Sequence, residues 1–165
     1  MSSQTSVESS DRPALRPILW LWIGAWIGAM ALFTAVTRTA FRVIPDPAVA
    51  GSLVGALLHP LLGIGALSGV GLSILAFRMR RGRVTIVLPL VLATACLLNQ
   101  FGVSRAVAEI HLTDPGLSPE LASRFAALHR LSVWLFTGTA AGAVVLAVFH
   151  AVAEMREARG RRPMR

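Results

Sequence analysis

The chain has 165 residues, of which 55% are hydrophobic, and it carries a formal net charge of +8. A mean hydropathy of +0.66 makes an ordinary soluble domain a poor fit and is typical of a small polytopic membrane protein. In so apolar a chain the positive charge is explained by membrane topology, so no nucleic-acid partner is predicted.

Four apolar stretches are long enough to cross a bilayer, whose hydrocarbon layer needs roughly 20 helical residues. They run over about residues 17–36, 50–77, 84–103 and 131–153. The sequence therefore predicts an all-α fold, a four-helix transmembrane bundle over residues 13–153. Residues 1–12 are polar without apolar periodicity and are predicted to be a disordered tail, and residues 154–165 are predicted to be a basic cytoplasmic tail.

The arginines indicate how the bundle is oriented. They are dense before the first span, between the second and third spans, and after the fourth: Arg12, Arg16, Arg78, Arg80, Arg81, Arg83, Arg156, Arg159, Arg161, Arg162 and Arg165. By the positive-inside rule both ends of the chain are predicted to be cytoplasmic. Every basic residue other than histidine is arginine, a coding bias that favours a bacterial source, and we expect a multi-pass protein of the bacterial cytoplasmic membrane.

Small residues at fourfold spacing predict close helix packing within the bilayer. The pairs are Gly24 and Gly28, Gly51 and Gly55, Gly65 and Gly69, and Gly138 and Gly142. Pro60 and Pro89 are predicted sites of bending. The third span is expected to continue as a more polar helix to about Ile110, and Ser118 is expected to cap a fourth helix that begins before it enters the membrane.

Polar side chains at membrane depth are candidates for function. The predicted topology places five of them in the outer leaflet: His59, Asn99, Gln100, His129 and Ser132. One interpretation is a binding site for a metal ion or a small polar solute. The other is that these groups satisfy one another and hold the helices in register.

No cofactor is predicted. Bis-histidine haem ligation would have to use His59 and His129, because His150 follows His129 by about 31 Å of helix. Cys96 is the only cysteine, which excludes an intramolecular disulfide. The sequence also contains no recognised catalytic motif, so no enzyme is predicted. Two alternatives remain. One is a small permease or resistance protein in which an oligomer completes the pathway. The other is a non-catalytic scaffold or accessory subunit with a membrane partner.

Four segments of the sequence resemble the transmembrane protein 205-like family of four-span membrane proteins. They are GAWIGAMALF (24–33), FRVIP (41–45) followed by Gly51, LATACLLNQF (92–101) and FAALHRLS (125–132). The most specific element is Phe125, Leu128, His129 and Ser132. The chain departs from the family pattern at Phe136, where an asparagine is frequent, and at His59, where an aromatic residue is common. The resemblance implies a four-span bundle, and an association with resistance to metal-like toxicants comes from a eukaryotic relative.

Overall fold

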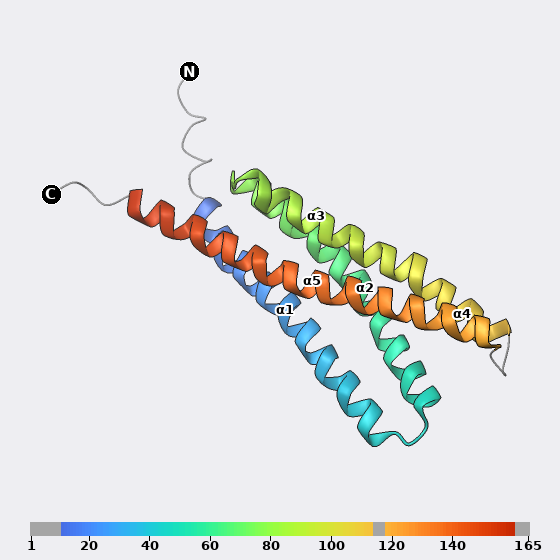
Figure 1. Ribbon diagram of the computed structural model, residues 1–165. Coiled ribbons are helices and arrows are strands. Elements are labelled where there is room, and N and C mark those ends of the chain that lie inside the picture. Colours follow the sequence, from blue (N-terminus) through green and yellow to red (C-terminus); the bar gives the residue numbers. More distant parts are fainter. Residues whose placement is uncertain (1–10, 114–117, 161–165) are drawn as a thin grey trace.

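The computed structural model describes residues 11–113 and 118–160, and every regular element in these ranges is a helix (Figure 1). The elements are α1 (Asp11–Val43), α2 (Pro47–Arg78), α3 (Arg83–Leu97), the π-helical segment η1 (Leu98–Val103), α4 (Ser104–Thr113) and α5 (Pro119–Gly160). Four stretches are long and apolar enough to span a membrane: Leu15–Val43, Pro47–Arg78, Arg83–Val107 and Pro119–Arg159. The predicted all-α, four-helix membrane bundle is confirmed.

Capping residues explain where two helices begin. Asp46 precedes α2 with extended backbone, and its Oδ1 accepts a hydrogen bond of 2.8 Å from the amide of Ala48, while Pro47 occupies the first helical position. Ser118 precedes α5, and its Oγ accepts from the amide of Leu121 at 3.4 Å. The predicted cap at Ser118 is therefore present.

Both ends of the described chain are more helical than the sequence indicates. α1 begins at Asp11, so residues 11–12 of the predicted tail are helical, and residues 1–10 lie outside the described residues. α5 continues to Gly160, so residues 154–160 of the predicted basic tail extend the last helix, and residues 161–165 lie outside.

The core follows one stripe of α1. Leu19, Ile23, Trp26 and Met30 are spaced three or four residues apart, so they share a face, and each is at most 4% exposed. They belong to one cluster with side chains of α2 and its C-cap residue, α3 and α5: Leu72, Met79, Leu92, Ala143 and Leu146. Lipid is as apolar as these side chains, so van der Waals packing and interhelical hydrogen bonds hold the helices together.

One end of the bundle is closed and the other is splayed (Figure 1). At the closed end, which we call the Arg81 end, α1 begins, α5 ends and the connection between α2 and α3 lies. Toward the other end, the second half of α1 and the first half of α2 lead away from α3 and α5 (Figure 1). Pro60 lies between the packed and the open parts of α2. Gly63, after it, is beside the Gln100 side chain, whereas Gly55, before it, has no heavy atom within 4 Å of where a Cβ would be.

Three of the eight predicted packing glycines lie at close helix contacts. A Cβ at Gly65 would be 2.9 Å from Cys96 Sγ, one at Gly69 would be 2.8 Å from Ala93 Cβ, and one at Gly142 would be 2.5 Å from Leu92 Cδ2. At Gly69 a Cβ would also meet the backbone carbonyl of Pro89, whereas at Gly65 and Gly142 it would displace the side chains of Cys96 and Leu92.

The packing role predicted for the other five glycines is wrong within one chain. No neighbouring atom lies within 4 Å of a Cβ built there, and all five are exposed: Gly24, Gly28, Gly51, Gly55 and Gly138. Fourfold spacing puts two residues on the same helix face, but it does not determine which face turns inward.

Candidate functional site

A π-helical segment interrupts the third membrane span where its polar residues lie. The amide of Ser104 donates to the carbonyl of Asn99, five residues earlier, and η1 covers Leu98–Val103 between α3 and α4. The wider turn changes the register of the helix faces, and Asn99 and Gln100 are both buried. Such segments in α-helices are frequently associated with functional sites.

The two amides contact two different helices. Gln100 Nε2 lies 3.2 Å from Nε2 of His59 on α2, which is within hydrogen-bond distance. Asn99 Nδ2 donates to the backbone carbonyl of Ser132 on α5 at 3.3 Å. Asn99 is fully buried, and its Oδ1 has no hydrogen-bond partner among the described residues. The structure therefore brings His59, Asn99, Gln100 and the backbone of Ser132 together around η1; we call these four residues the η1 site.

His129 does not join this site. Its side chain is exposed and stacks on Phe125 one turn earlier in α5, with ring centroids 6.2 Å apart and an interplanar angle of 8°. Ser132 contributes its carbonyl rather than its hydroxyl. In the described parts of the chain, no group of three or more His, Cys, Asp or Glu side chains is arranged to hold a metal ion.

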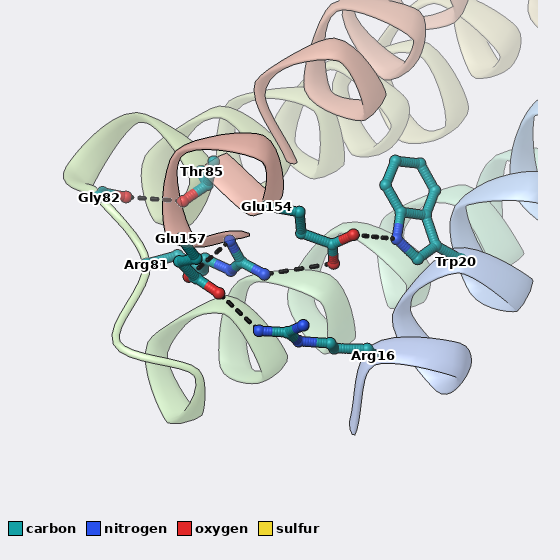
Figure 2. Close-up of polar contacts among 7 residues, drawn as sticks. All are labelled: Arg16, Trp20, Arg81, Gly82, Thr85, Glu154 and Glu157. Atoms are coloured by element: carbon teal, nitrogen blue, oxygen red, sulfur yellow. Dashed lines mark hydrogen bonds and ion pairs between the residues drawn. The ribbon is translucent and has the colours of Figure 1, made fainter. Parts of the chain in front are cut away.

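A second polar cluster lies at the Arg81 end and joins three parts of the chain (Figure 2). Arg81, in the connection between α2 and α3, has a side chain only 2% exposed. Its Nη1 is 2.9 Å from Glu157 and its Nη2 is 3.3 Å from Glu154, both on α5. From α1, Arg16 pairs with Glu157 at 2.6 Å, and the Trp20 indole donates to Glu154 at 3.1 Å. We call these five residues the Arg81 network.

His150 lies one helical turn before Glu154 and is completely buried. Neither ring nitrogen has a hydrogen-bond partner among the described residues. The network therefore stands directly next to a buried imidazole.

Sequence reasoning assigned the arginines of this cluster to membrane topology and missed the network. The available signal was Glu154 and Glu157, two acids three residues apart in an otherwise basic segment. Three-residue spacing on a continuing helix places both carboxylates on one face. Because residues 154–165 are predicted to be a tail rather than a helix, the sequence does not predict that the two carboxylates share a helix face.

Comparisons with known proteins give a family. No curated protein and no solved structure matches the chain. A family model described as a domain of unknown function (DUF4149) matches residues 21–114, more than half of the 165 residues. The match contains His59, Asn99, Gln100 and Arg81, whereas Glu154 and Glu157 lie beyond it. The chain, with its four helices long and apolar enough to span a membrane, is therefore a member of the DUF4149 family.

Proposed function

We propose that this protein is a small membrane permease, acting in solute movement or resistance, and that the η1 site binds the solute. The observation that carries the proposal is the Asn99 side chain, which is fully buried within a membrane span and has an amide oxygen without a partner among the described residues. An unsatisfied polar group away from water costs free energy of folding. A solute that donates a hydrogen bond would satisfy it.

The side chains of the site favour a neutral, hydrogen-bonding solute over a metal ion. Two amides and an imidazole offer both donors and acceptors, whereas tight transition-metal sites use several imidazoles, thiolates or carboxylates. We therefore narrow the proposal from metal ions to small neutral polar molecules. Catalysis forms no part of it.

Orientation and assembly are further parts of the proposal. The arginines concentrated at the Arg81 end favour a cytoplasmic position for that end, in a bacterial cytoplasmic membrane. Four helices enclose little pathway, so we propose that the permease works as a homo-oligomer. The resemblance of four segments to the transmembrane protein 205-like family agrees with a role in resistance, although that assignment is by analogy.

Solute permeation into proteoliposomes tests this function. Purified full-length protein is reconstituted and mixed rapidly with urea or glycerol, and reswelling is followed by light scattering. We expect faster reswelling than in protein-free liposomes with at least one solute, and loss of that increase in Asn99→Leu. The matched control is Thr94→Val on α3, since the Thr94 hydroxyl donates to Leu90 of its own helix and Thr94 is exposed. Wild-type rates equal to those of protein-free liposomes with both solutes would refute the proposal.

One observation favours the alternative, a scaffold or accessory subunit. Gly51 and Gly55 are exposed in the splayed half of α2 with open space around them, as a helix-docking face requires. A scaffold predicts that Gly55→Leu abolishes association with a different membrane protein, measured by cross-linking in membranes, while the Asn99 variant associates normally. The permease as proposed predicts that permeation depends on Asn99.

A further inference from the structure

An open groove of about 540 Å³ lies at the Arg81 end, where α2 meets α3. It is lined by three arginines and two apolar side chains: Phe77, Arg78, Arg80, Arg81 and Ile86. Its size is within the range of ligand sites in proteins. The combination of guanidinium groups and apolar walls is suited to an amphiphile with an anionic group.

One of the groove's arginines, Arg80, has a strained backbone conformation. The amide of Arg81 donates to the Ala76 carbonyl at 3.0 Å and that of Arg80 to the Phe77 carbonyl at 2.9 Å, which closes α2 in a Schellman motif. Arg80 occupies the position of this motif that normally holds glycine and has a φ of 54°. A non-glycine residue in this conformation costs folding free energy, and such strain is concentrated at functional sites.

The three arginines have different roles in the groove. Arg81 is buried and paired with Glu154 and Glu157, so it forms a fixed wall whose charge is largely balanced. Arg78 and Arg80 are exposed, and a guanidinium group is a planar set of donors that matches the geometry of a phosphate. The positive end of the α3 dipole adds to this field, since Gly82 provides no side-chain cap there.

A bilayer crossed by α2 and α3 would place the groove at the depth of a lipid headgroup. It joins the ends of two candidate spans, Pro47–Arg78 and Arg83–Val107. Leading away from it along α2, Val70, Ile74 and Phe77 are exposed and are spaced four and three residues apart, so they share one face. An acyl chain can follow this apolar face while the phosphate stays at the arginines.

We propose that this groove binds the phosphate group of an anionic phospholipid, with Arg78 and Arg80 as its ligands. Basic pockets between membrane helices on the cytoplasmic side are suited to anionic headgroups. This groove is separate from the η1 site, so the proposal of lipid binding does not depend on the proposal of solute permeation. It goes beyond the general attraction of basic segments to a charged surface, because it assigns binding to two particular arginines.

Native mass spectrometry of the full-length protein, titrated with dioleoyl phosphatidylglycerol or dioleoyl phosphatidylcholine, tests the site. We expect the anionic lipid to bind at least tenfold more tightly, and R78Q/R80Q to lose about tenfold in that affinity. The matched control is R156Q/R159Q, which removes the same charge from exposed positions on α5 that do not line the groove, and it should stay within twofold of wild type. Equal losses in the two double variants, or equal binding of the two lipids, would overturn the proposal.

Two further measurements separate folding and ligand source from binding. Arg80→Gly relieves the positive φ, so it should unfold no more readily than wild type and still bind phosphatidylglycerol more weakly; wild-type lipid affinity in this variant contradicts the assignment. Soluble glycerol 3-phosphate should bind at least a hundredfold more weakly than the lipid. Similar affinities would overturn the lipid and assign the groove to a soluble phosphate ester.

Discussion

Removing one carboxylate from the Arg81 network should destabilise the closed end of the bundle. Glu154→Gln keeps the size of the side chain and an oxygen that can accept from Trp20, but it removes the charge 3.3 Å from the buried guanidinium of Arg81. At an effective dielectric of 20 this pair is worth about 5 kcal/mol, and in water about 1.3 kcal/mol. Glu154 is 25% exposed and Glu157 still pairs with Arg81, so we expect a net loss of about 2–3 kcal/mol, below the range for an uncompensated buried charge.

The assay is reversible unfolding of full-length protein in mixed micelles with an increasing fraction of sodium dodecyl sulfate, followed by tryptophan fluorescence. Arg16→Gln is the matched control, since it removes a pair from the same network in which the side chains are 35% and 41% exposed. Exposed pairs contribute about 0–1 kcal/mol. The reasoning fails if Glu154→Gln loses no more stability than Arg16→Gln, because burial of Arg81 would then have no energetic effect.

Three further predictions concern packing in the bilayer. In the same unfolding assay, Gly69→Ala should destabilise the folded protein by about 1–3 kcal/mol through overpacking. Gly24→Ala has open space around it and should be neutral or stabilise the protein by up to about 1 kcal/mol. Equal effects of the two substitutions would contradict the contacts described. Trp22→Phe should cost about 1 kcal/mol, because it removes the indole bond of 3.1 Å to the buried Ser68 hydroxyl, and a neutral result would mean that this bond contributes nothing. Cys96 is 1% exposed, so a maleimide should label it only as fast as the bundle opens, and rapid labelling of folded protein would disprove its burial.

The sequence was sufficient for the architecture because span length and apolar composition are strong signals. A bilayer requires every backbone polar group to be satisfied, and roughly 20 apolar residues in a row have few structures available other than a helix. The α3 to α4 continuation and the cap at Ser118 were also accessible, because polar composition and capping residues are local signals. Helix rotation is a tertiary property, which is why Gly65 and Gly24 could not be distinguished.

The candidate sites show the same division. Asn99 and Gln100 were identified because amides at membrane depth are rare, but the π-helical turn that buries them has no sequence signature. His129 was grouped with them from its depth alone, and rotation of α5 leaves it exposed. In the Arg81 network, the residues of α1 and α5 that contact each other are 134 to 141 positions apart in the sequence. Sequence periodicity does not predict contacts between residues so far apart.

The network also has a consequence for synthesis of the protein. Arg16 and Arg81 are translated long before Glu154 and Glu157, so the nascent chain carries both arginines without their carboxylate partners until the last helix emerges. During that interval the guanidinium of Arg81 must remain at the aqueous boundary, where water solvates it, and this fixes the end of the hairpin formed by α2 and α3. Arrival of α5 then supplies both acids together. The final helix thus completes the bundle at the end where the first helix began, and a chain truncated before residue 154 lacks the charges that close it.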